Sequence, residues 1–325
     1  MQRRQLVALS IAALAMPRAL FAQSKRVYRI GVLDDAVESA LSALWPHFRN
    51  RLRELVLKDG NDVAYEARYA SGATERLPTL AAELVALKPD LIVVVSTPAT
   101  LALAKATTTI PIVFNGIGDP LSSGIVSSLA RPGGNLTGTS IRSSEVGVKL
   151  LDLLLEIAPR AKRLAYLSDV KNKSAQATFE KIKENAARVA AKVLFLDARR
   201  RSNLERSLET LRRERVQGLI VGAGAVLVEH REPIVQFAAQ NRLPVVYGRR
   251  DYMEIGGLLA YGAGGSADYA RTADYAYRIL RGGKPADLPV EQSTKLNLLL
   301  NLKTARALGI KIPDSIRLRA DEVIE

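Results

Sequence analysis

Two periodicities alternate along the chain from residue 27 onward. Short runs rich in β-branched residues, such as 27–33, are followed by longer stretches with apolar residues three or four positions apart, such as 43–58. Residues 91–95 are apolar without interruption, which is typical of a strand buried on both faces of a parallel sheet. The alternation predicts strands and helices in a doubly wound open α/β sheet.

The strand–helix pattern occurs in two successive series. The first series predicts strands at 27–33, 63–69, 91–95 and 110–114, and helices at 43–58, 74–87 and 98–107. The second begins after Asn135 and predicts strands at 163–168, 192–196, 218–221, 244–247, 256–261 and 294–300, and helices at 145–157, 175–191, 204–214, 231–241, 267–280 and 302–308. Two similar series predict two lobes of similar design.

The N-terminus has the composition of a secretory signal. Arg3 and Arg4 precede an apolar stretch at 5–16, and Ala22 precedes a polar residue. The stretch is shorter than the roughly 20 residues that span a bilayer. We therefore expect residues 1–22 to be removed as a signal peptide; an amphipathic first helix is the alternative.

Composition excludes several classes of function. The chain has no cysteine, which rules out disulfides, thiolate catalysis, zinc–cysteine sites and a lipid-anchored cysteine. We therefore expect a free protein in the periplasm. No serine lies in a nucleophile elbow, and His47 and His230 both fall in or beside helices. We expect neither an enzyme nor a metal or cofactor site.

The net charge of +14 does not by itself indicate a nucleic-acid partner. Most basic residues alternate with acidic ones along the predicted helices. The one dense cluster, residues 199–201, lies in an apparent loop without interleaved aromatic residues. A solvated surface is the favoured interpretation, and no nucleic-acid partner is expected.

Polar residues after the strands are the first candidates for a binding site, because open α/β sheets bind ligands at the carboxyl ends of their strands. Ser96 and Thr97 precede Pro98 at a helix start, where N–H groups and the helix dipole favour a carboxylate. The alternative is that Thr97 only caps its own helix. Asp119 follows the next strand and suits a ligand ammonium; the alternative is a simple Asp-Pro turn. Together the two sites suit an α-amino acid.

Other strand-end residues complete the set. The glycine-rich segment 131–138 predicts a crossover between lobes with Thr137 facing the cleft, or alternatively a surface turn. Gly222 follows a strand but lacks the third glycine of a dinucleotide fingerprint, so it is expected to line the cleft instead. Tyr247 and Tyr261 lie near strand ends, where they either stack on a ligand or pack internally.

Several sequence runs resemble a known family, the ABC-transporter substrate-binding proteins that include the tryptophan/tyrosine-type binding proteins. The matching runs are Ser96-Thr97-Pro98-Ala99, residues 110–114 with Gly118-Asp119-Pro120, residues 129–138, Gly256-Gly257-Leu258 with Tyr261-Gly262, and residues 283–292, 301–305 and 318–324. They cover essentially the whole mature chain.

This resemblance implies a periplasmic-binding-protein-like fold with a three-crossing hinge. Lobe one is expected at 27–137 and 262–286, and lobe two at 138–261 and 287–325. The family implies a monomer that captures a small, amino-acid-like ligand and delivers it to the membrane permease of an ABC importer. A binding module that feeds a sensor or chemoreceptor is the alternative.

The expected ligand-binding residues come from both lobes. They are Asp34, Ser96, Thr97, Asp119 and Thr137 in lobe one, and Ser168, Asn172, Gly222, Tyr247 and Tyr261 in lobe two. Lobe two departs from the family pattern. An Asn-Pro pair is usual where this chain continues from Ser168 to Asn172, and a serine or aspartate is usual near Gly222. The resemblance therefore does not identify the ligand.

Overall fold

The computed structural model describes residues 26–38, 44–263 and 265–325. The predicted signal peptide at 1–22 lies outside the described residues. No helix among them is both long enough and apolar enough to cross a membrane.

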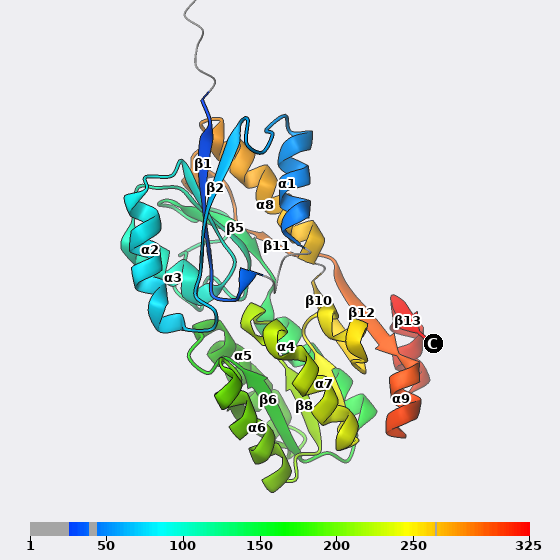
Figure 1. Cartoon of the computed structure of the whole chain (residues 1–325). Helices are drawn as coiled ribbons and strands as arrows, with labels where there is room; N and C mark the ends of the chain where they lie inside the picture. Colours follow the sequence, from blue (N-terminus) through cyan, green and yellow to red (C-terminus); the bar gives the residue numbers. More distant parts are fainter. Residues whose placement is uncertain (1–25, 39–43, 264) are drawn as a thin grey trace, which may run out of the picture.

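Lobe one is built on a six-stranded sheet in which every neighbouring pair is parallel. Its order is β11-β5-β4-β3-β1-β2, with β1 (Tyr28–Asp34), β2 (Val63–Tyr69), β3 (Leu91–Val94), β4 (Ile112–Ile117), β5 (Leu136–Ser140) and β11 (Glu291–Gln292). On one face lie α1 (Trp45–Glu54) and α8 (Gly265–Leu280), and on the other α2 (Leu77–Ala86) and α3 (Thr97–Ala106) (Figure 1). Helices on both faces explain why β3 is apolar at every position.

Lobe two is built on a seven-stranded sheet. Its order is β13-β12-β10-β9-β8-β6-β7, with β6 (Arg163–Ser168), β7 (Lys192–Asp197), β8 (Gly218–Val221), β9 (Val245–Tyr247), β10 (Leu259–Ala263), β12 (Leu296–Asn301) and β13 (Glu322–Ile324). Only β10 and β12 pair antiparallel among these described strands. The α/β prediction is confirmed in both lobes.

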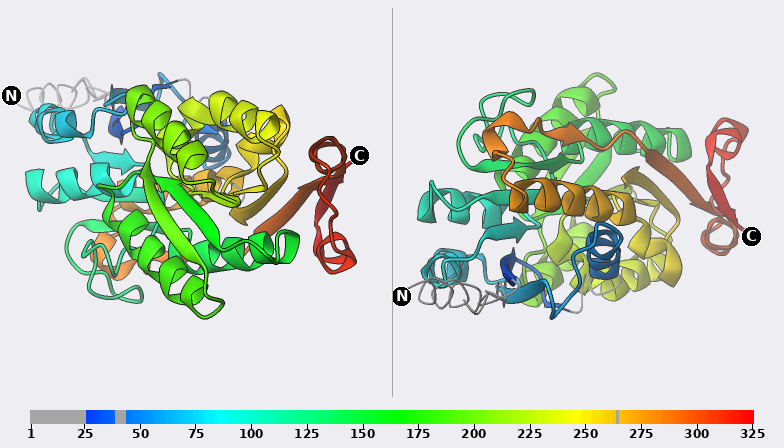
Figure 2. Two further views of the ribbon diagram at one scale, coloured as in Figure 1. Left: turned by 90° about the horizontal axis from the view of Figure 1, so that it is seen from below. Right: turned by 90° about the horizontal axis from the view of Figure 1, so that it is seen from above.

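Helices again cover both faces of the second sheet. One core joins α4 (Ser143–Ile157), α5 (Lys173–Ala187), α9 (Leu302–Leu308) and α10 (Asp314–Arg319) to the sheet, and the other joins α6 (Arg201–Arg213) and α7 (Arg231–Gln240). Short 3-10 helices are η2 (Thr74–Arg76), η3 (Ala225–His230), η4 (Arg250–Ile255) and η5 (Pro285–Asp287). The segment from β12 to the C-terminus projects at one side (Figure 2).

The chain passes between the lobes after β5, between β10 and α8, and between β11 and β12. Each passage lies C-terminal to the predicted boundaries at 137, 262 and 286. For the first and third passages, the reason is that β5 and β11 extend the first sheet. The sequence pattern indicated a glycine-rich turn where β5 lies and no strand where β11 lies. Gly138 permits β5 to extend the sheet, because its φ is +150° and a Cβ there would lie 1.9 Å from the carbonyl oxygen of Phe114.

Hydrogen bonds between the lobes hold them in a closed arrangement. The backbone N–H of Val37 donates to Glu229 Oε1 at 2.7 Å, and that of Asp119 donates to Ser174 Oγ at 3.0 Å. The carboxyl ends of the parallel strands of each sheet thereby face the other lobe (Figure 1).

Candidate ligand-binding site

A cavity of about 60 Å³ lies between the lobes at the strand ends, and we call it the acidic compartment. Lobe one contributes residues after β1, β3 and β4, and lobe two contributes residues after β6 and β8. Its polar lining consists of Asp35, Ser96, Thr97, Ser143, Tyr166, Ser168, Asp169, Asn172, Ser174 and Thr178. The compartment is thus assembled only when the lobes close.

Two aspartates face this compartment from opposite lobes. Asp35 and Asp169 are each 3% exposed, and neither Asp35 Oδ1 nor Asp169 Oδ2 has a hydrogen-bond partner. Asp169 Oδ1 lies 3.3 Å from Arg199 Nε, but Arg199 also pairs with Asp197 at 2.8 Å. An unpaired buried carboxylate oxygen is costly, so this site favours a ligand that supplies donors and positive charge.

Burial shifts the proton affinities of these acids. Desolvation raises the pKa of Asp35 well above its ordinary value, and the negative charge of Asp34 raises it further. Desolvation likewise raises the pKa of Asp169. A cation placed between the two carboxylates would favour their ionised forms.

Asp34, a predicted site residue, lies directly behind the compartment. It is 1% exposed, and its Oδ1 accepts a hydrogen bond from the Ala36 N–H at 3.0 Å. Burial raises the pKa of Asp34 to about 6, although Arg249 opposes the shift. Asp34 therefore adds negative charge to the site, while the next residue, Asp35, lines the compartment.

Ser96 and Thr97 both line the acidic compartment, but much of the α3 N-terminus is already occupied. The Ala99 N–H donates to Ser96 Oγ at 3.3 Å, so Ser96 and not Thr97 is the N-cap. Pro98 has no N–H. Within the described part of the chain, the Thr97 N–H is the one first-turn donor left without a partner, which makes this a weak carboxylate seat.

The structure places Asp119 outside the compartment. Its Oδ1 accepts a hydrogen bond from the Ser122 N–H at 3.3 Å, which is the arrangement of an Asp-Pro turn. Its backbone N–H, not its carboxylate, contacts lobe two through Ser174. Among the described residues of lobe one, the carboxylate that lines the compartment is that of Asp35 and not that of Asp119.

Three further predicted residues have their partners within one lobe; Thr137 and Tyr247 are buried and Tyr261 is partly buried. Thr137 is fully buried and donates to the Leu288 carbonyl at 2.7 Å. Its hydroxyl therefore joins β5 to the segment at Leu288 within lobe one and does not face the cleft. Tyr247 is 1% exposed and stacks on Tyr252 at a centroid distance of 4.4 Å within lobe two. Tyr261 packs against the core formed by α4 and α5. Internal packing is the role observed for both tyrosines.

The remaining lobe-two predictions lie at the compartment or on its border. Ser168 and Asn172 line it. Asn172 Oδ1 also accepts from the Ser174 N–H at 2.9 Å, capping α5. Gly222 lies just behind, where a Cβ would be 2.8 Å from both Ser168 Oγ and Tyr166 Oη. Gly222 therefore makes room for these hydroxyls.

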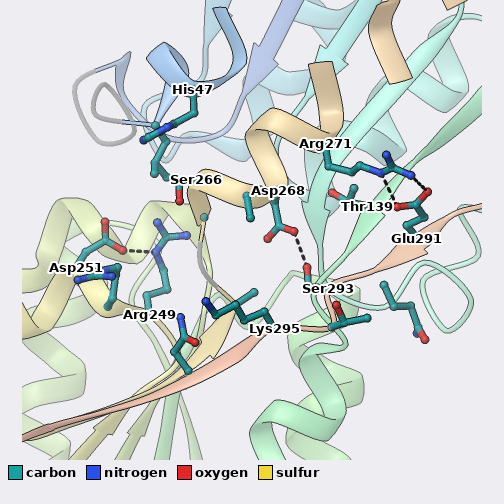
Figure 3. A pocket seen from close by; sticks show the side chains of 18 of the residues that line it. His47, Thr139, Arg249, Asp251, Ser266, Asp268, Arg271, Glu291, Ser293 and Lys295 are labelled. Atoms are coloured by element: carbon teal, nitrogen blue, oxygen red, sulfur yellow. Dashed lines mark hydrogen bonds and ion pairs between the residues drawn. The ribbon is translucent and has the colours of Figure 1, made fainter. Parts of the chain in front are cut away.

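Two larger spaces continue from the acidic compartment. A middle compartment of about 70 Å³ shares Gly116 and Ala223 with it, among other residues, and adds Arg249, Asp268 and Tyr269. An outer compartment of about 840 Å³ shares Arg249 and Asp268 with the middle one (Figure 3). The three spaces form one interlobe cleft that widens toward the crossings.

Polar groups in the wider part of the cleft are mostly paired. Arg249 Nε donates to Asp251 Oδ2 at 2.8 Å, and Ser293 Oγ donates to Asp268 Oδ1 at 2.6 Å (Figure 3). The Tyr269 hydroxyl is buried without a hydrogen-bond partner. The outer compartment is therefore a polar vestibule, whereas the acidic compartment holds the unpaired carboxylates.

Sequence reasoning missed Asp35, Asp169 and Arg249. Asp35 and Asp169 each follow a predicted residue, Asp34 or Ser168, by one position. Asp35 lies two residues beyond the predicted strand 27–33, and Asp169 lies one residue beyond the predicted strand 163–168, so inspection of both positions after each strand finds them. Arg249 follows β9 by two positions.

Comparison with known proteins gives a consistent result. The family described as ABC transporter substrate binding protein matches residues 30–324. The "Tyrosine-binding protein" of Clostridioides difficile (strain R20291) is 24% identical over 300 residues, covering 92% of this chain and 85% of that protein.

Solved structures are similar over the same extent. A conserved domain protein of Vibrio cholerae has a TM-score of 0.85 at 26% identity, covering 92% of this chain and 100% of that one. An ABC domain from Streptococcus pneumonia in complex with L-Trp has a TM-score of 0.83 at 25% identity, with the same coverage. The ligand-free, open structure of a Clostridium difficile substrate-binding protein reaches 0.62 at 25% identity, covering 92% and 99%. The chain thus resembles the ligand-bound form more than the open one.

Proposed function

Because the chain belongs to the family of ABC transporter substrate-binding proteins, we propose that it captures an amine-bearing, amino-acid-like solute and delivers it to the permease of an importer. Proteins of this family bind solutes and are not enzymes. The predicted signal peptide, residues 1–22, supports export to the periplasm, where we propose that the protein acts as a monomer. A sensor module would capture its ligand in the same way and would differ only in its partner.

The observation that carries this proposal is the pair of unpaired carboxylate oxygens, Asp35 Oδ1 from lobe one and Asp169 Oδ2 from lobe two. A ligand amine between them contacts both lobes only when the lobes are closed. Its differential affinity for the two arrangements would shift the equilibrium toward closure. A closed, loaded form is the signal that a permease needs to recognise.

Relatives support an amino-acid-like ligand. The names of two similar proteins specify tyrosine binding and bound L-Trp. An amine is common to both of those ligands, and it is the group that the acidic compartment is equipped to hold.

A thermal-shift screen of the mature protein against amino acids, amines, sugars and carboxylic acids tests the proposal. A ligand at 100 times its Kd adds about 2.7 kcal/mol to the free energy of unfolding. Asp35→Asn and Asp169→Asn should each abolish most of that increase. Asp119→Asn is the matched control, because its side chain only caps a turn, and it should retain the increase. A ligand response lost in the control but kept in both other variants would contradict the proposed site.

A further inference from the structure

The charges around the cleft specify the solute more narrowly, and this inference rests on the proposed function. We infer that the solute carries a net positive charge: a small organic cation held by a protonated amine or guanidinium, without a carboxylate bound in the acidic compartment.

The described lining residues of the two inner compartments are predominantly acidic. In the acidic compartment the only charged lining residues are Asp35 and Asp169. The middle compartment adds Asp268 and Arg249, which makes three carboxylates against one guanidinium. Asp34 lies behind the compartment and increases the excess of negative charge.

Both nearby arginines are already engaged by acids. Arg249 donates to Asp251 at 2.8 Å, and its charge also acts on Asp34 and Asp268. Arg199 makes its closest ion pair with Asp197 at 2.8 Å and is shared with Asp169. Glu229, which accepts from the Val37 N–H, contributes a further negative charge near Asp34. Arg199 is therefore not free to bind a ligand carboxylate. Arg249, whose Nε is used by Asp251, lines the middle and outer compartments and not the acidic one.

The N-termini of the helices at the cleft do not supply a strong binding site for a ligand carboxylate either. At α3, Ser96 Oγ occupies the Ala99 N–H and Pro98 lacks one. At α5, Asn172 Oδ1 occupies the N–H groups of Ser174 and Ala175, at 2.9 and 3.4 Å. A carboxylate entering the acidic compartment would meet two carboxylates and few free donors.

An organic cation fits better than a metal ion. Within the described residues, no group of three or more His, Asp and Glu side chains is placed to hold a metal. The two unpaired oxygens come from opposite lobes, and an ammonium has three donors while a guanidinium has five. One such group can satisfy both oxygens and still donate to Ser96 or Ser168, while the rest of the solute extends toward the outer compartment.

Matched pairs of compounds that differ only by a carboxylate test the inference. We would titrate the mature protein by calorimetry with tyrosine and tyramine, lysine and cadaverine, and arginine and agmatine. The amine should bind more tightly than its amino acid, by about tenfold in the best pair. Asp35→Asn and Asp169→Asn should each weaken binding of that amine by at least about tenfold. Asp119→Asn should leave its affinity unchanged. Melting temperatures of the variants confirm that they are folded.

The outcomes separate the inference from the proposed function. If amino acids bind as tightly as their amines, or more tightly, the inference that no carboxylate is bound beside Asp35 and Asp169 is overturned, while solute capture stands. If neutral tyrosine binds as tightly as cationic tyramine, the net positive charge is overturned as well. If only uncharged or acidic compounds from the thermal-shift screen bind, the inference is overturned together with the amine-binding role of the site. If nothing binds in either experiment, both proposals fail.

Discussion

At the scale of single residues, the main feature of the site is that its carboxylates are buried without full pairing. Asp34, Asp35 and Asp169 are all at most 3% exposed in the closed arrangement. Removing a carboxylate from water without full pairing is unfavourable, so an empty closed cleft stores a free-energy penalty that a cationic ligand can relieve. We therefore expect the same three residues to affect both stability and ligand binding.

Asp34 contributes to the pH dependence of unliganded stability, in the same direction as Asp35 and Asp169. Its pKa rises from 3.8 in the unfolded chain to about 6 in the fold, so between these values the folded state holds a proton that the unfolded state has lost. The free energy of unfolding therefore falls as pH rises through this window, by up to about 3 kcal/mol. Asp34→Asn should raise the melting temperature at pH 7.5 and change it little near pH 4. A lower melting temperature at pH 7.5 would contradict this account.

At the scale of elements, the tyrosines illustrate how a strand end can point into a core. Tyr247 closes β9, yet its ring stacks on Tyr252 from η4 inside lobe two. Tyr252 in turn donates to the Leu227 carbonyl at 3.0 Å. The stack fixes the turn that carries Arg249 toward the cleft.

Substitution of Tyr247 separates packing from binding. Tyr247→Ala should lower the free energy of unfolding by about 3–5 kcal/mol, because it empties a fully buried ring position. Tyr247→Phe keeps the stack and should leave ligand affinity unchanged. Chemical denaturation and calorimetry measure the two quantities. A large loss of affinity in Tyr247→Phe would restore the prediction that this residue binds the ligand.

Much of the element order was predictable from sequence, because buried parallel strands such as β3 are continuous apolar runs. Strand β5 was not, since Thr137, Gly138 and Thr139 resemble a loop and find their partners only in the folded sheet. Thr139 Oγ1, for example, accepts from the Gly116 N–H at 2.8 Å. The site was only partly predictable, because its residues too depend on contacts made in the folded sheet. The strand ends locate the cleft, but the direction of each side chain decides whether it lines the cleft, as Ser168 does, or lies in the interior of a lobe, as Thr137 does.

At the scale of the whole molecule, closure depends on close contact across the cleft. Gly118 in lobe one lies so near lobe two that a Cβ would be 1.7 Å from Ser174 Oγ. The three passages between the lobes lie on the side away from α2 and α6 (Figure 1). A hinge there lets the strand ends approach or separate as rigid units.

A methyl group at Gly118 should act as a wedge. Gly118→Ala is expected to hold the lobes apart and weaken ligand binding at least tenfold, with little effect on the stability of either lobe. Gly224→Ala is the comparison for an added methyl group without a clash between the lobes: Gly224 also lines the acidic compartment, but the nearest atom to its added Cβ is 3.8 Å away. Calorimetry and thermal unfolding check both. Full affinity in Gly118→Ala would show that binding does not need the observed contact.

The most direct test measures the separation of the lobes with and without ligand. The chain lacks cysteine, so cysteines introduced at the exposed positions Ala82 on α2 and Ser202 on α6 can carry spin labels. Saturation with the tightest-binding compound of the titrations should shift the label distances to a shorter, narrower distribution, and Asp35→Asn with Asp169→Asn should abolish that shift. A bound ligand that leaves the distribution unchanged would contradict capture by closure between the two carboxylates.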